Sequence, residues 1–145
     1  MGMLFAVGVG GGMGALARYY VAGWLQPPGA AFNWGIFIVN ITGGLLMGMI
    51  VEAGALRLNL SPELRSFLTV GILGGYTTFS AFSLQTLQLV QEGEVAAAGA
   101  NIGVSVALCL AAVWLGQVEG GRIEWDPALE DVHMNLEATL SARLG

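Results

Sequence analysis

A cluster of glycines and hydroxyl-bearing residues interrupts a long apolar stretch in the middle of this chain. The cluster reads GGYTTFSAF at residues 74–82, and the stretch around it runs over residues 66–90. Irregular backbone survives in hydrocarbon only where protein or a water-filled site covers it, because unpaired amides and carbonyls are costly there. Channels and transporters bind ions at such breaks. The motif therefore predicts a transmembrane helix that is broken around an ion.

The composition also indicates a membrane protein. Hydrophobic residues make up 55% of the chain and charged residues 10%, whereas a soluble domain carries about 25% charged residues. Four apolar stretches, at 4–25, 34–56, 66–90 and 95–118, are each long enough to cross the bilayer. We therefore predict an all-α membrane protein with four transmembrane helices, the third broken mid-membrane, and a single channel domain over residues 1–118.

Residues 119–145 form an acidic C-terminal tail. Asp126 and Pro127 are typical of a helix start, and an apolar stripe follows at Leu129, Val132, Leu136 and Leu140. This pattern predicts a short amphipathic helix. The formal net charge of −5 comes mainly from this tail, and it gives no reason to expect a nucleic-acid partner.

Glycines recur at four-residue spacing in the predicted helices, as at Gly10 and Gly14, Gly44 and Gly48, and Gly71 and Gly75. Small residues at this spacing let the backbones of membrane helices approach closely. Because four helices leave little room for a pore within one chain, we also expect a homo-oligomer, most simply a dimer.

Several polar residues lie at membrane depth. Asn40 could bond across helices or line a path for ions, and the sequence leaves both open. Asn101, Ser105 and Cys109 recur every four residues and share one helix face, as helix-to-helix contacts or as a narrow polar path. Arg18 lies near a helix end, where we expect it to anchor the helix or to line a vestibule.

Phe79 and Phe82 are three residues apart and project from the same side of a helix. They could simply pack, as most membrane phenylalanines do. The edge of an aromatic ring is electropositive, however, so the pair could also face an anion.

The motif at 74–82 resembles the signature of the Fluc (CrcB) family of fluoride channels, whose pattern is roughly GGxTTFSTF. The resemblance extends to residues 14–19, to Trp34-Gly35 followed by Asn40, and in all to about residues 3–118. It implies a passive fluoride-selective channel in the cell (inner) membrane, which exports fluoride and lowers its toxicity in the cytoplasm. The sequence offers no catalytic constellation, since its one histidine, His133, lies in the tail. We therefore do not expect an enzyme.

The resemblance also implies an assembly and a site. Two antiparallel copies would form a dual-topology homodimer in which the two helix breaks meet at the centre. There, carbonyls matching Gly74 and Thr77 would hold a structural sodium ion that is not transported. We expect glycine at position 74 to supply a backbone shape that a β-branched residue would distort. The predicted fluoride pore residues are Asn40, Thr78, Phe79, Ser80, Phe82 and Ser105.

The chain departs from the family pattern at four positions, which carry Ile36, Ala81, Gln85 and Asn101. Relatives commonly have threonine at the first two, glutamate at the third and tyrosine at the fourth. These differences bear on conduction rate and on the outer polar path more than on the ion type.

Charge gives a weak signal for orientation. Arg57, Arg65 and Arg122 would lie on one side and Arg18 toward the other, which favours cytoplasmic termini. The resemblance implies both orientations within one dimer, and this is our prediction.

Two other classes compete with the channel. A small multidrug-type proton-coupled exporter shares the size and the four helices, but needs a carboxylate within the membrane. The candidate, Glu52, lies near the end of the second helix. A non-transporting assembly subunit would leave the helix break unexplained.

Overall fold

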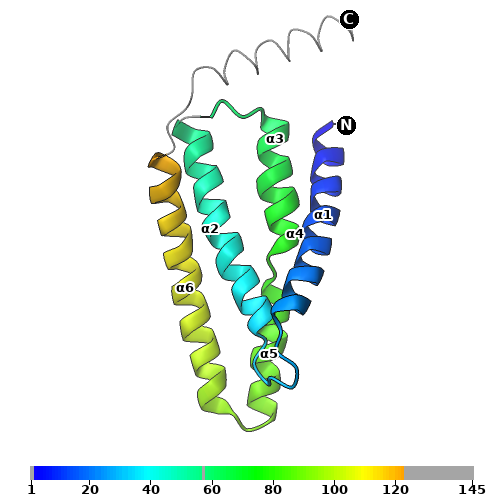
Figure 1. Cartoon of the computed structure of the whole chain (residues 1–145), viewed down its shortest axis with the longest axis vertical. Helices are drawn as coiled ribbons and strands as arrows, with labels where there is room; N and C mark the ends of the chain where they lie inside the picture. The colour runs from blue at the N-terminus through cyan, green and yellow to red at the C-terminus, as the bar shows by residue number, and fades with distance from the viewer. Residues whose placement is uncertain (1, 57, 123–145) are drawn as a thin grey trace, which may run out of the picture.

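The computed structural model describes residues 2–56 and 58–122, and every regular element within these ranges is helical. The elements in chain order are α1 (Gly2–Leu25), α2 (Trp34–Leu56), α3 (Pro62–Ser66), the π-helical segment η1 (Phe67–Leu73), α4 (Gly74–Tyr76), α5 (Phe79–Gln91) and α6 (Val95–Arg122). The segments α3, η1, α4 and α5 follow one another along a single line interrupted after α4 (Figure 1). The amphipathic helix predicted for the tail lies outside the described residues.

Three of these helical stretches are long and apolar enough to cross a membrane: Trp34–Leu56, Pro62–Gln91 and Val95–Arg122. The third stretch in the chain, from α3 through α5, thus counts as one span of 30 residues. The prediction of an all-helical protein with several membrane-crossing helices is confirmed for the described residues.

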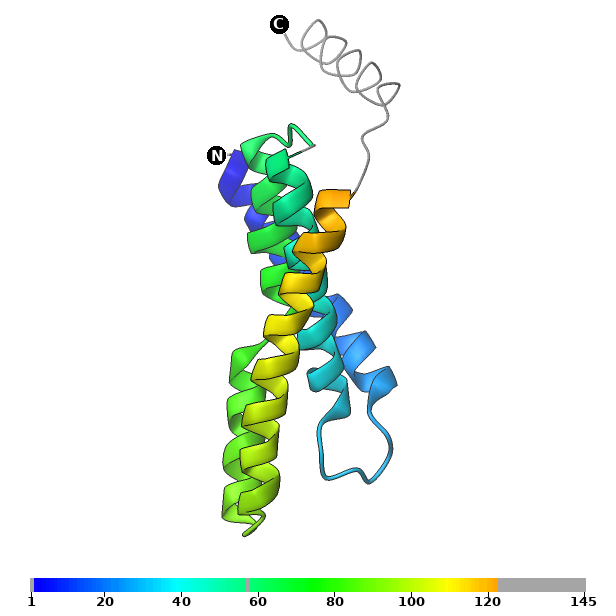
Figure 2. The same ribbon diagram turned by 90° about the vertical axis from the view of Figure 1, so that its left-hand side faces the viewer.

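The helices are arranged as a bundle that opens at one end. The most extensive contact is between α2 and α6, while α1 packs mainly against η1 and α4. The α5 and α6 helices run antiparallel, joined by a turn in which Gly93 has a φ of 83°. Beyond the interruption after α4, the α5–α6 pair diverges from the α1–α2 end (Figure 2). The cavities described below lie around this interruption.

Glycines allow the backbones of these helices to touch. A Cβ atom added at Gly48 of α2 would collide with the carbonyl oxygen of Val113 in α6, and one at Gly116 of α6 with that of Leu45 in α2. The same holds between α1 and the third stretch, where a Cβ at Gly10 would lie 2.7 Å from the Phe67 carbonyl oxygen. Close packing through glycine is therefore confirmed at these contacts.

Replacing Gly48 by alanine is expected to lower the free energy of unfolding by about 1–3 kcal/mol, the usual effect of overpacking. The α2 and α6 backbones must separate, because the nearest neighbour of the new Cβ atom is the main-chain oxygen of Val113, which has no rotamer to change. Gly99→Ala is the matched control, since nothing lies within 4 Å of a Cβ added there. Thermal unfolding in detergent should show a lower midpoint for the first variant only, and equal midpoints would contradict the packing.

A side-chain clasp fixes the connection between α1 and α2. The Gln26 Nε2 atom donates to the carbonyl oxygens of Ala30 (3.3 Å) and Phe32 (3.1 Å), and its Oε1 accepts from the Gly35 amide at 3.3 Å. One glutamine therefore pairs with both the loop and the first turn of α2. Gln26 and Asn33 also line the larger of two cavities described in the next subsection, so this pairing fixes the loop beside that cavity.

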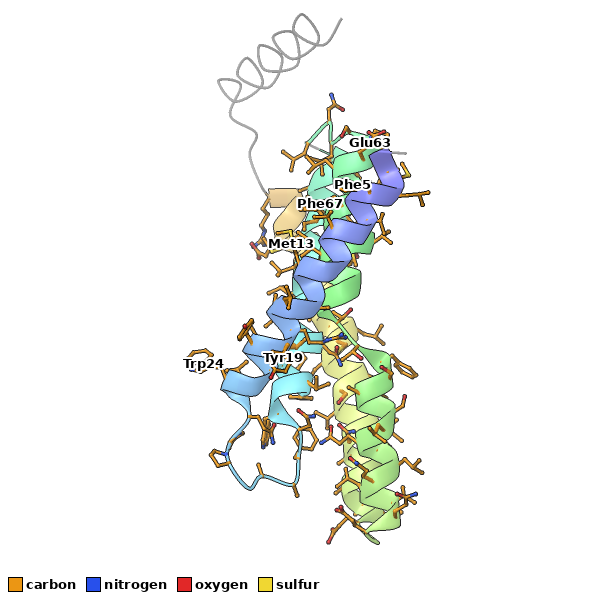
Figure 3. All side chains as sticks on the ribbon, turned by 90° about the vertical axis from the view of Figure 1, so that its right-hand side faces the viewer. Phe5, Met13, Tyr19, Trp24, Glu63 and Phe67 are labelled. Atoms are coloured by element: carbon orange, nitrogen blue, oxygen red, sulfur yellow. The ribbon has the colours of Figure 1, made fainter. Side chains whose placement is uncertain are left out.

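The outer face of α1 carries large apolar side chains. Phe5, Met13, Tyr19 and Trp24 are 75%, 51%, 74% and 84% exposed, and Trp24 points away from the bundle (Figure 3). Tyr and Trp are typical of the zone where a membrane helix meets water. This face is suited to contact with lipid.

Candidate functional site

The third helical stretch is interrupted at two threonines. Thr77 has φ −81° and ψ 158°, and Thr78 has φ −152° and ψ 118°, both extended conformations. Gly74 instead has φ −64° and ψ −37°, which is ordinary helical geometry. The expectation that glycine at position 74 supplies a special backbone shape is therefore wrong. β-Branched residues favour extended backbone, and here they form the interruption.

Asn40 of α2 pairs with the main chain of this interruption. Its Oδ1 accepts from the Thr78 amide at 2.8 Å, and its Nδ2 donates to the Thr78 carbonyl oxygen at 3.1 Å. The side-chain amide thus takes the place of a neighbouring peptide group. Its Nδ2 has a second hydrogen that this pairing does not use. Of the two roles left open for Asn40, bonding between helices is the one that these contacts establish.

The interruption removes the regular helical partners of two carbonyl groups. In a continuous helix the Thr78 amide would donate to Gly74 and the Ala81 amide to Thr77. Here the Thr78 amide donates to Asn40, and the Ala81 amide donates to the Thr78 Oγ1 at 3.3 Å. The carbonyl oxygens of Gly74 and Thr77 therefore lack their helical partners, which leaves lone pairs for other groups to bind. Such oxygens are the donors that hard cations bind, so the donor type fits a sodium ion.

Arg18 of α1 reaches the same place. Its Nη1 donates to the Thr77 carbonyl oxygen at 3.2 Å. A carbonyl oxygen has a second lone pair, so this contact leaves Thr77 one position for another partner. Arg18 thus lies beside the helix interruption.

A cavity of about 320 Å³, which we call the phenylalanine cavity, lies on one side of the interruption. It is lined by Asn40, Thr77, Thr78, Phe79, Phe82, Ser105, Val106, Cys109 and Leu110. The rings of Phe79 and Phe82 have centroids 5.4 Å apart and are tilted by 44° to each other. Five of the six predicted pore residues are thus brought to one cavity by α2, the interruption, α5 and α6.

A second cavity, which we call the arginine cavity, has a volume of about 620 Å³. It is lined by Ala15, Arg18, Tyr19, Ala22, Gly23, Gln26, Asn33, Ile36, Thr78, Ser80 and Ala81. Ser80, the sixth predicted pore residue, lines this cavity and not the first. Its Oγ lies 3.0 Å from the Thr78 Oγ1. Thr78 lines both cavities, so the helix interruption is what separates them.

The polar stripe predicted on α6 is divided between two roles. Ser105 and Cys109 line the phenylalanine cavity, whereas Asn101 is 3% exposed and its Nδ2 donates to the Thr86 Oγ1 of α5 at 2.9 Å. The Ser105 Oγ in turn donates to the Asn101 Oδ1 at 3.1 Å. Asn101 thus links α6 to α5.

Three features of the site were not predicted from the sequence. They are the Arg18 contact to Thr77, the Thr86 contact to Asn101, and the burial of Gln85, whose Nε2 has no hydrogen-bond partner among the described residues. Each depends on how two helices face each other. Spacing within one helix carries no signal for that.

The apolar helices and the interruption between two cavities define an all-helical, multi-pass membrane protein with a candidate ion site. Residues 5–117 match the family model described as CrcB-like protein, Camphor Resistance (CrcB). The chain therefore belongs to the CrcB family.

Curated relatives support the same assignment. A protein of Geotalea daltonii named "Fluoride-specific ion channel FluC" is 46% identical over 111 residues, which cover 76% of this chain and 90% of the relative. A protein of the same name from Geobacter sulfurreducens is 45% identical over 117 residues, covering 80% and 94%. "Fluoride-specific ion channel FluC 1" of Nitrobacter hamburgensis is 48% identical over 114 residues, covering 78% and 90%.

Proposed function

We propose that this protein is a passive, fluoride-selective ion channel that exports fluoride across the cell (inner) membrane and lowers its toxicity in the cytoplasm. It is not an enzyme. Residues 1–118 form the channel domain with four transmembrane helices, the third broken mid-membrane, and residues 119–145 form an acidic tail. The observation that carries the proposal is the phenylalanine cavity, which gathers Asn40, Phe79 and Phe82 in a chain whose relatives are named fluoride channels.

The chemistry of the phenylalanine cavity suits a small anion. Fluoride is strongly hydrated, so a selective path must replace its water with closely spaced donors. The free hydrogen of the Asn40 amide, the hydroxyls of Thr78 and Ser105 and the ring edges are such donors. The residues that line this cavity carry no formal charge. Binding is therefore weak enough for the anion to leave as well as to enter.

The arginine cavity serves as the approach to this path. Arg18 gives it a positive charge and Ser80 a hydroxyl group. A positive charge in a cleft raises the local concentration of anions. Fluoride would pass from here across Thr78 into the narrower cavity.

We infer a dual-topology homodimer of two antiparallel copies, with the two interruptions meeting at its centre. Phe79 is 77% exposed and Gly74 is exposed in a single chain, as expected of groups that a second copy would cover. The carbonyl oxygens of Gly74 and Thr77 from both copies would hold a sodium ion that is not transported. When bound, the ion supplies a positive charge that offsets the oxygen dipoles of the two interruptions.

Fluoride efflux from proteoliposomes tests the proposed function. We expect rapid fluoride efflux with the purified protein and chloride efflux close to that of protein-free vesicles. If chloride leaves as readily as fluoride, the protein is not a fluoride-selective channel.

The proton-coupled exporter makes a different prediction in the same vesicles. Its candidate carboxylate, Glu52, lies against Gly120 and Gly121 near the ends of α2 and α6, and it is not among the residues that line either cavity. Proton-driven uptake of an aromatic cation, abolished by Glu52→Gln, would favour the exporter over the channel.

Dual topology predicts that a label on one connection reaches both sides of the membrane. Glu94 lies in the exposed turn between α5 and α6, so Glu94→Cys should react with a membrane-impermeant thiol reagent at about half of the molecules in intact cells and at the rest after lysis. The unmodified chain, whose single cysteine is Cys109, gives the background. Complete labelling, or none, in intact cells would contradict dual topology.

A further inference from the structure

Three hydrogen bonds form a continuous series that connects the phenylalanine cavity to the contact between α5 and α6. The Ser105 Oγ donates to the Asn101 Oδ1 at 3.1 Å, and the Asn101 Nδ2 donates to the Thr86 Oγ1 at 2.9 Å. The Thr86 Oγ1 donates to the Phe82 carbonyl oxygen at 2.9 Å. We refer to Ser105, Asn101 and Thr86 as the relay.

The direction of the relay is set at Thr86. Its one hydroxyl hydrogen points to the Phe82 carbonyl, which can only accept, so Thr86 must accept from the Asn101 Nδ2. The Asn101 Oδ1 then faces Ser105 and takes its hydroxyl hydrogen. Ser105 lines the phenylalanine cavity, yet in this state its only donor is directed toward Asn101 and not into the cavity.

We propose that Asn101 is a positioning residue that reverses the relay when an anion enters the phenylalanine cavity. In the reversed state Thr86 donates to the Asn101 oxygen, the Asn101 amide donates to the Ser105 oxygen, and Ser105 donates to the anion. This inference rests on the proposed function, since it takes fluoride to be the anion that enters.

An asparagine is suited to this reversal because its side-chain oxygen and nitrogen have the same shape but opposite hydrogen-bonding roles. Turning the amide by half a turn exchanges the two atoms, and the hydroxyls of Thr86 and Ser105 need only rotate their hydrogens. The resting relay holds three hydrogen bonds. The reversed relay holds two and gains its third from the anion. Fluoride binding at Ser105 thus competes with the bond from Thr86 to the Phe82 carbonyl.

Thr86→Val tests the relay without altering the lining of a cavity, since Thr86 is not among the lining residues of either one. The change removes two of the three bonds from the resting state but only one from the reversed state. The variant should therefore bind fluoride more tightly than the wild type. We expect the fluoride concentration that half-saturates the efflux rate to fall roughly three- to tenfold, which is the effect of one hydrogen bond. Thr86→Ser keeps the hydroxyl and should leave this concentration unchanged.

Introducing Thr86→Val into an Asn101→Leu background completes a double-mutant cycle for these two residues. With the amide gone, Thr86 and Ser105 are no longer connected, so Thr86→Val should have no effect there. If Thr86→Val leaves the half-saturating concentration unchanged in the wild-type background, or lowers it equally in both backgrounds, the relay is overturned while the channel proposal stands. If the wild type itself passes no fluoride, both proposals fall together.

Discussion

Replacing either Phe79 or Phe82 by isoleucine is expected to reduce fluoride current sharply while the protein stays folded. Isoleucine keeps an apolar side chain at the cavity wall but removes the electropositive ring edge that we propose to face the anion. Each 1.4 kcal/mol added to the barrier for passage lowers the rate about tenfold. We therefore expect single-channel or macroscopic currents lower by about tenfold or more in each variant.

The chain offers a matched control for this experiment. Phe5 is 75% exposed and Phe79 is 77% exposed, but Phe5 lies on α1, away from the residues that line either cavity. Phe5→Ile should conduct like the wild type. Fluoride currents at the wild-type level in both Phe79→Ile and Phe82→Ile would remove the two rings from the mechanism.

Asn40→Leu is expected to abolish conduction and also to destabilise the fold. The Thr78 amide and carbonyl oxygen would both lose their partner, and a buried polar group left without one costs about 1–3 kcal/mol. Since Thr78 is only partly buried, we expect the free energy of unfolding to fall by about 2–4 kcal/mol for the two groups together. Thermal or denaturant unfolding in detergent measures this loss.

Thr42→Val on the same helix is the comparison for Asn40→Leu. It removes the contact between the Thr42 Oγ1 and the Tyr76 hydroxyl, 3.2 Å apart, and the donation from the same Oγ1 to the Ile38 carbonyl oxygen at 2.9 Å within α2. The loss between helices should cost only about 0.5–1.5 kcal/mol. Equal stability losses in the two variants would show that Asn40 contributes no more than an ordinary bond between helices.

Much of the fold could be predicted because its signals are local. Hydropathy gave the long helices, and four-residue glycine spacing gave contacts such as those at Gly10 and Gly48. The motif located the helix interruption but misplaced its cause, since Gly74 is helical and Thr77 and Thr78 are extended. The partner of Thr78 lies 38 residues away in the chain, and no pattern within the third stretch could reveal it.

The candidate site, like the fold, could be predicted where the signal lies within one helix. Three-residue spacing was enough to bring the rings of Phe79 and Phe82 together, because both lie in the first turn of α5. Spacing did not separate Ser80 from them, although Ser80 lines the arginine cavity. Which cavity each residue meets depends on how α5 is oriented against α1, α2 and α6, and a single sequence carries no information on that orientation.

The glycine contacts between α2 and α6 distinguish two walls of the phenylalanine cavity from the third, which is formed by α5. Asn40 stands on α2 and Ser105 on α6, and these two helices touch backbone to backbone at Gly48 and Gly116. These backbone contacts oppose any change in the distance between the two helices. The α5 wall, which carries both phenylalanines, follows two extended residues and is tethered at Thr78 by Asn40. A wider cavity therefore requires α5 to move relative to α2 and α6, against the hydrogen bond from Asn101 to Thr86 that links α6 to α5.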